Sequence, residues 1–160
     1  MSNTHQLGTE VVQTVNWTVF GGVRANVEPM TVTASGRPDL ACYAQAMRLD
    51  TAVLVTGLRE VLGARLVAYL GGVRETRAVR QWAEGIRGVQ DPADERRLRL
   101  AYRVAGLLSV REPAGVVQAW FQGLNPQLGD RAPVRVLRED DLDDAGPLVL
   151  AAARSFAATG

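Results

Sequence analysis

Residues 120–133, WFQGLNPQLGDRAP, separate two stretches of helical periodicity and have the composition of neither an ordinary helix nor a strand. Asn125-Pro126 favours a turn after a helix, because a residue before proline avoids the helical region of backbone space. Gly129 tolerates a positive φ, and Pro133 suits the first position of a new helix. The pattern predicts a rigid helix–loop–helix connection. The apolar residues that we expect to pin it to the core are Trp120, Phe121 and Leu128.

Helical spacing of apolar residues continues on both sides of this loop, which predicts an all-α fold. Downstream, Pro133 starts a short turn through Leu137, and the acidic run 139–144 indicates a solvated linker. Gly146-Pro147 then opens a last helix to about Ala158. Upstream, the predicted helices span 51–62, 64–70, 75–84, 96–110 and 113–124.

The segment 96–110 has a strong amphipathic pattern. Its predicted core face consists of Leu98, Ala101, Tyr102, Ala105 and Leu108. The side that we expect to lie nearer the solvent carries Arg96, Arg99 and Arg103.

Residues 1–46 differ in kind from the rest of the chain. Apolar residues stand there among Thr and Asn, and Gly21-Gly22 and Pro29 act as breakers, so the pattern predicts an irregular or short-strand N-terminal arm. Such an arm packs on the helical body, pairs with another chain or is mobile, and the sequence leaves all three open. Its apolar residues include Val11, Val15, Trp17, Val19 and Val32.

A chain of 160 residues suits one domain, or two small ones that share a core. Apolar residues make up 47% of the sequence and aromatic residues only 6%, so we expect a core of Val, Leu and Ala. No apolar run has the length of a membrane span and no signal peptide is apparent, so we expect a cytoplasmic protein. Cys42, the single cysteine, is expected to be a buried structural thiol.

The charge distribution is uneven although the net charge is only +1. All 18 basic residues are Arg, with 3 Arg against 4 acids in residues 1–58, 11 against 6 in residues 59–111, and 4 against 7 in residues 112–160. A basic middle and an acidic end suit two surfaces for two different partners, although uneven solvation of helical surfaces also explains the pattern.

The stretch 67–85, VAYLGGVRETRAVRQWAEG, resembles a helix-turn-helix. Gly71 and Gly72 permit a sharp turn, and Val73, Val79 and Trp82 are expected to face the core. A structural helix pair has the same pattern, so DNA binding remains a hypothesis. Glu75 either selects a cytosine or weakens phosphate binding. The side chains that would reach DNA are Arg74, Thr76, Arg77, Arg80 and Gln81.

From about Arg59 to the end, the order of motifs resembles the bacterial Xre/MbcA/ParS-type antitoxins: a helix-turn-helix ending in W-A-x-G at 82–85, an Arg-rich amphipathic helix, then W-F-x-x-x-N-P-x-L-G. The chain departs from the family at Gly129-Asp130, where Gly-Gly is usual, and at Ala132-Pro133, where Thr-Pro is usual. The resemblance implies a helix-turn-helix region at 47–90 and a helical toxin-binding domain at 91–160, whereas the N-terminal arm at 1–46 has no counterpart in the short members of the family.

The family resemblance also implies a function. Such antitoxins pair with RES-domain toxins that degrade NAD, cover the entrance to the toxin's active site, and with the toxin repress their own operon. We therefore expect a non-enzymatic chain without a cofactor, a homodimer within a hetero-oligomer, and two partners, a RES-like toxin and operator DNA. The residues expected to contact the toxin are Asn125, Pro126, Leu128, Gly129, Leu148, Arg154 and Phe156.

Two other functions fit the same residues. One is a stand-alone helix-turn-helix transcription regulator whose C-terminal domain dimerises, and the other is an interaction module without a DNA role. Catalytic alternatives have little support: His5 is the only histidine, no P-loop or GxGxxG motif is present, and the acidic run lacks the spacing of an EF-hand.

Overall fold

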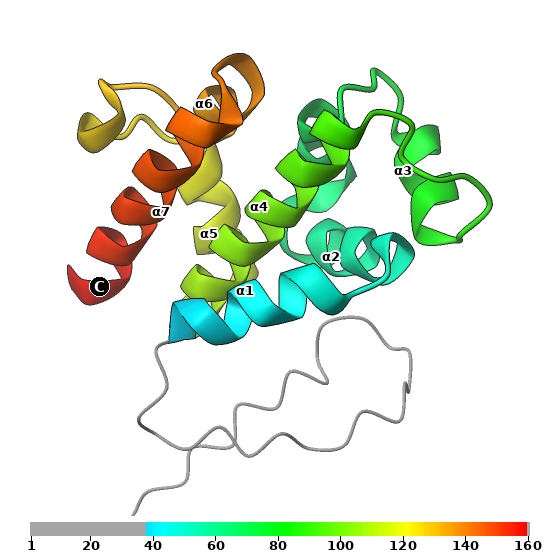
Figure 1. Cartoon of the computed structure of the whole chain (residues 1–160). Coiled ribbons are helices and arrows are strands. Elements are labelled where there is room, and N and C mark those ends of the chain that lie inside the picture. Colours follow the sequence, from blue (N-terminus) through cyan, green and yellow to red (C-terminus); the bar gives the residue numbers. More distant parts are fainter. Residues whose placement is uncertain (1–37, 160) are drawn as a thin grey trace, which may run out of the picture.

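A computed structural model describes residues 38–159, and within that range it contains seven α-helices, one 3-10 helix and no β-strand (Figure 1). The all-α prediction is confirmed for this part of the chain. The apolar residues of the predicted arm from Val11 to Val32 lie outside the described residues. The elements are α1 Pro38–Arg48, α2 Thr51–Leu70, α3 Thr76–Ala83, α4 Pro92–Ser109, α5 Ala114–Gln122, η2 Pro126–Leu128, α6 Pro133–Glu139 and α7 Leu142–Thr159.

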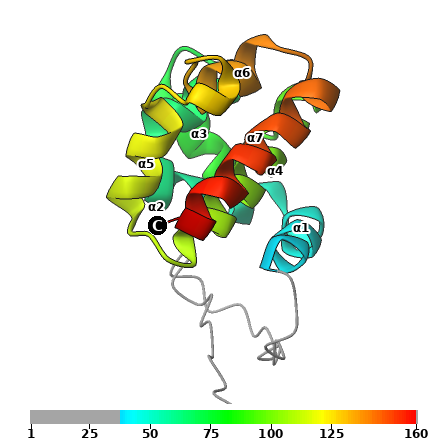
Figure 2. The same ribbon diagram turned by 90° about the vertical axis from the view of Figure 1, so that its left-hand side faces the viewer.

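Helix α4 lies in the middle of the bundle and packs against α1, α2 and α7 (Figures 1 and 2). Its helical period places apolar side chains on several sides, so that they meet helices from both ends of the chain. The whole predicted core face is buried, which confirms that part of the sequence interpretation. The helix begins at Pro92 rather than near residue 96, because Asp91 caps it by accepting a hydrogen bond from the Ala93 amide at 2.8 Å.

The break predicted after residue 62 is present as a kink within α2. Gly63 has φ 79° and ψ 155°, a conformation outside the helical region and one that glycine adopts without strain. The Gln118 side chain of α5 donates a hydrogen bond to the Leu62 carbonyl at 3.0 Å, next to the kink. Because α5 supplies this bond, the change in helix direction leaves the Leu62 carbonyl with a hydrogen-bond partner.

The prediction of an irregular arm is wrong for residues 38–46, which form most of α1. Cys42 and Ala46 are buried against the core side of this helix. At the C-terminal end of α1, the Arg99 guanidinium donates hydrogen bonds to the carbonyls of Ala46 at 2.7 Å and Leu49 at 3.0 Å. A helix C-terminus presents unpaired carbonyls, so a cation from α4 stabilises this end.

The acidic residues of 139–144 are exposed, as predicted, but the prediction that they form a linker is wrong. Helix α6 continues through Glu139, and α7 begins at Leu142, so Pro147 lies inside the last helix instead of opening it. The Asp141 carboxylate accepts a hydrogen bond from the Asp143 amide at 2.8 Å, and Asp143 and Asp144 occupy the first turn of α7. Acidic side chains there satisfy free amides and interact favourably with the helix dipole, so this run starts a helix.

Candidate DNA and partner surfaces

The turn between α2 and α3 depends on glycine and on Trp82. A Cβ atom built on Gly71 would lie 2.6 Å from the Trp82 ring, so only glycine allows this close approach. Gly72 has φ +69°, which also favours glycine. Val79 and Trp82 are buried and Val73 packs at the edge of the core. These three predicted core contacts are therefore confirmed, and they hold α3 in a fixed position against α2.

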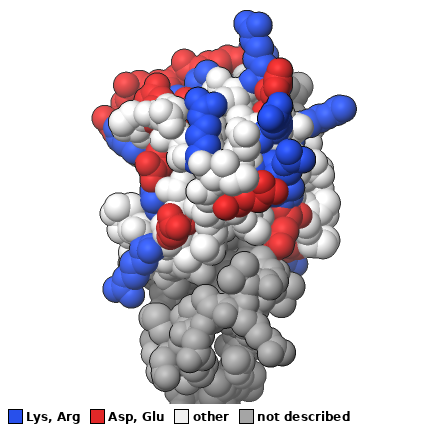
Figure 3. Space-filling model, turned by 90° about the vertical axis from the view of Figure 1, so that its right-hand side faces the viewer, with Lys and Arg blue, Asp and Glu red and all other residues white. Residues whose placement is uncertain are grey.

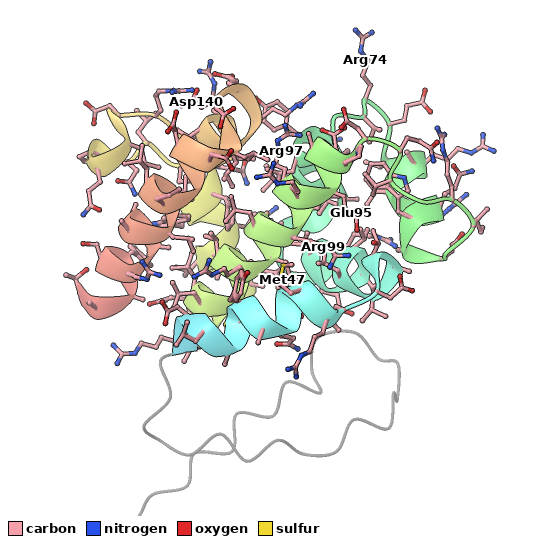
Figure 4. All side chains as sticks on the ribbon, in the orientation of Figure 1. Met47, Arg74, Glu95, Arg97, Arg99 and Asp140 are labelled. Carbon is pink, nitrogen blue, oxygen red and sulfur yellow. The ribbon has the colours of Figure 1, made fainter. Side chains whose placement is uncertain are left out.

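The side chains predicted to reach DNA lie mostly on the outer surface of this helix pair. Arg74, Thr76, Arg77 and Arg80 are exposed, whereas Gln81 is half-buried. Arg74 points away from the body at the turn before α3 (Figure 4). Arg80 also faces Glu84 at 3.8 Å, and both side chains are well exposed, so this pair contributes little stability.

An open groove of about 720 Å³ lies between the second half of α2 and the start of α3. Sequence reasoning missed the α2 wall of this groove, where Arg65 and Tyr69 are one helical turn apart. Figure 3, the face on the α3 side, shows arginine groups gathered on its upper part with carboxylates among them. The residues lining the groove are Arg65, Ala68, Tyr69, Val73, Arg74, Glu75, Thr76 and Arg77.

Several arginines of the basic middle are not available to a partner. Arg97 is buried and donates hydrogen bonds to the carbonyls of Leu137 at 2.8 Å and Leu70 at 3.1 Å, and it pairs with Asp94 (Figure 4). Arg99, expected to lie nearer the solvent, is instead partly buried. It binds Glu95 at 2.7 Å, which lowers the pKa of that carboxyl. Two arginines of the basic middle, Arg97 and Arg99, therefore bind carbonyls near the ends of other helices and are not free to bind a partner.

The loop predicted from the opening motif is held by its own polar groups. The Asn125 side chain accepts a hydrogen bond from the Gln127 amide at 2.9 Å, and the Asn125 carbonyl accepts one from Asp130 at 3.0 Å. Gly129 has φ +66°, as predicted, and Asp130 has φ +56°. Leu128 and Phe121 are buried, which confirms that they pin the loop to the core. The structure places the Asn125 side chain at a cap within the loop.

A charged cluster braces the other end of this loop. Arg131 binds Asp140 at 2.8 Å and Glu139 at 3.2 Å, and Arg135 binds Glu139 at 2.9 Å. The hydrogen bond from Arg131 lowers the pKa of Asp140, and the hydrogen bond from Arg135 lowers the pKa of Glu139. The Tyr69 hydroxyl also donates to Glu139, at 3.3 Å. These contacts join the loop and α6 to the groove side of α2.

The α7 residues predicted to bind a partner occupy three different settings. Leu148 is 55% exposed and is available for contact. Arg154 is paired with Asp39 of α1 at 2.7 Å, and Phe156 is half-buried with its ring 6.4 Å from that of Trp120. Trp120 itself stands edge-on to Phe121 at 5.4 Å, as expected of a support beneath the loop.

The surface next to these residues contains further contacts that the sequence did not single out. Leu124, which directly precedes the loop, is 75% exposed, a larger fraction than for any other large apolar side chain in residues 38–159. The side chain of Gln127 in η2 donates a hydrogen bond to the Ser155 hydroxyl of α7 at 3.0 Å. This bond ties η2 to the α7 face that carries Leu148, because residues 148 and 155 lie two helical turns apart.

Chemistry beyond binding has few candidates in the described part of the chain. Burial raises the pKa of the Cys42 thiol to about 11, so this cysteine is not activated as a nucleophile. Within residues 38–159, no group of three or more His, Cys, Asp or Glu side chains is arranged to hold a metal ion. The helices in that range are also too short or too polar to cross a lipid bilayer.

Comparison with known proteins found no matching family model, no similar curated protein and no similar solved structure.

Proposed function

We propose that this chain is the antitoxin of a type II toxin–antitoxin system that binds and blocks a RES-like, NAD-degrading toxin. We further propose that it represses its own operon by binding operator DNA. The proposal rests on the order of the motifs from Arg59 onward, and the chain itself would be neither an enzyme nor an NAD-binding protein. Two exposed surfaces of different chemistry support a protein with two partners.

The structural observation that supports the proposal is the separation of these two surfaces. The groove between α2 and α3, lined in part by Arg65, Arg74 and Arg77, lies on one side of α4. The loop at η2 and the outer face of α7, with Leu124 and Leu148 exposed, lie on the other side (Figure 1). One body therefore presents a surface suited to nucleic acid and another suited to an apolar contact, without overlap.

Co-expression with the product of a neighbouring gene that encodes a RES-like protein tests the antitoxin role. The wild-type chain should co-purify with that product and keep cellular NAD at its normal level. Leu148→Asp should lose both effects, because a charge placed in the centre of an apolar contact is costly to bury. Leu40→Asp is the matched control, since Leu40 of α1 is also 55% exposed.

Normal rescue by Leu148→Asp would argue against docking through α7. Failure of the wild-type chain to bind the toxin would overturn the antitoxin role itself. A chain that forms a stable dimer alone and binds promoter DNA without any toxin would instead be a stand-alone transcription regulator that dimerises through its C-terminal region. The exposed Leu124 and Leu148 favour this second candidate as well, because two copies of such a surface suit each other.

A further inference from the structure

Glu75 occupies an unusual place on the surface that we assign to DNA. It directly precedes α3 and lines the same groove as Arg65, Arg74 and Arg77. Its backbone has the extended conformation of an N-cap residue, with φ −110° and ψ 133°, yet its side chain makes no capping hydrogen bond. The side chain is exposed, and the ion pairs among residues 38–159 do not include it. The carboxylate therefore has no evident structural role.

A carboxylate at this point is unfavourable for binding to the phosphate backbone alone. Phosphate contacts come from Arg and from amides, and a negative charge within a Debye length of them weakens binding to every DNA sequence equally. Glu75 is also the only acid that lines the groove. Neutral residues would serve a purely electrostatic surface better.

A carboxylate is, however, well suited to one base. Cytosine presents the N4 amino group, a hydrogen-bond donor, in the major groove, and Glu or Asp accepts this bond. Arginine is the usual partner of the O6 and N7 acceptors of guanine. Arg77 lies in the first turn of α3, two residues after Glu75, so the same end of the helix carries both an acceptor for cytosine and a donor for guanine.

We propose that Glu75 is a specificity-determining residue, whose carboxylate accepts a hydrogen bond from the N4 amino group of a cytosine in the major groove. Arg77 contacts a guanine beside it. The assignment rests on the proposed DNA binding. The charge of Glu75 then lowers the affinity for DNA of any sequence. At a site with a C·G pair in the correct position, the hydrogen bond to cytosine compensates for this loss, so part of the discrimination results from repulsion at other sites.

The test measures the affinity of the full chain for three sets of DNA duplexes at one salt concentration. The first is the duplex upstream of its own gene, the second replaces each C·G pair of that duplex in turn by T·A, and the third has random sequence. The wild-type chain should lose about tenfold or more in affinity at one replaced C·G pair. Glu75→Ala should bind the random duplex several-fold more tightly and lose the discrimination at that pair.

Glu84→Ala is the matched control, because it removes an exposed negative charge from the other end of α3. It should also tighten binding to the random duplex but keep the discrimination at the C·G pair. An equal gain of Glu75→Ala on every duplex, with the wild-type discrimination retained, would overturn the assignment. If the wild-type chain binds none of the duplexes, the proposed DNA binding is overturned and the role of Glu75 with it. The melting temperature of both variants should equal that of the wild-type chain.

Discussion

The turn before α3 and the turn before α6 hold their shapes in different ways. The first is fixed by apolar packing, with Gly71 against the Trp82 ring, while Arg74 and Arg77 are free of ion pairs within the described residues. The second is fixed by polar groups, above all the Asn125 cap and Arg131. Substitution of a contact residue should therefore separate binding from folding in the first region. In the turn before α6, substitution of a contact residue should weaken binding and also destabilise the fold.

The largest effect is expected at Arg97, which joins the two regions through the carbonyls of Leu70 and Leu137. Arg97→Met should lower the free energy of unfolding by about 3 kcal/mol or more, because it leaves two buried carbonyls and part of Asp94 without their partner. Urea unfolding followed by circular dichroism measures this loss. Arg96→Met is the control: Arg96 is 63% exposed and its surface pair should contribute less than about 1 kcal/mol. Similar effects of the two variants would show that Arg97 does not join the regions.

Gly71 tests the apolar turn. Gly71→Ala should lower the free energy of unfolding by about 1–3 kcal/mol, because the new methyl group overlaps the Trp82 ring and α3 must move. The measurement is thermal melting together with the fluorescence of the tryptophans. Gly88→Ala, at a position where a Cβ meets no atom within 4 Å, should change stability by less than about 0.5 kcal/mol. An unchanged melting temperature of Gly71→Ala would contradict the packing account of this turn.

Asn125 tests the polar turn. Asn125→Ala should cost about 1 kcal/mol through loss of the cap on the Gln127 amide, and toxin binding should weaken with it. Asn125→Asp keeps an acceptor oxygen at the cap and should recover most of the stability in the same unfolding experiment. Weak toxin binding by a fully stable Asn125→Ala variant would instead make Asn125 a direct contact.

The smallest effect on stability is expected from the double substitution of Arg74 and Arg77 by Ala, because both side chains are exposed and make no ion pair in residues 38–159. Binding to the promoter duplex should nevertheless weaken. The slope of log affinity against log salt should fall by about 1, because Arg74 neutralises about one phosphate charge whereas loss of Arg77 removes a base contact. A salt titration measures the slope, and thermal melting of the same variant checks that its stability is unchanged. An unchanged slope would indicate that α2 and α3 form a structural pair without a DNA role.

Much of the helical framework was predictable because it depends on local chemistry. Gly63 adopts a positive φ without strain and so interrupts the helix at that residue. The turn at Asn125-Pro126 and Gly129 likewise follows from the backbone preferences of its own residues. The amphipathic period of α4 likewise identified its buried face. Each of these features lies within a few residues of sequence.

The errors lie where distant partners decide the outcome. Residues 38–46 become a helix that contacts α4. Arg99 of α4 satisfies the carbonyls at the end of this helix, which no local pattern in the segment indicates. The acidic run 139–144 does not form a linker. Asp140 pairs with Arg131 from the loop before α6, and Asp143 pairs with Arg96 of α4, so contacts from other elements hold this run in place.

Between residue 51 and the loop at 125–129, the sequence by itself determined most of the helices and turns, since backbone preferences and apolar periodicity act over short distances. Only the tertiary structure decided what each charge does. Arg96 and Arg97 are neighbours of the same chemical type, yet one is exposed and the other caps carbonyls at residues 70 and 137. The physical reason is that a buried guanidinium is stable only where carbonyls or carboxylates from other elements converge on it, and that convergence exists only once the helices have packed.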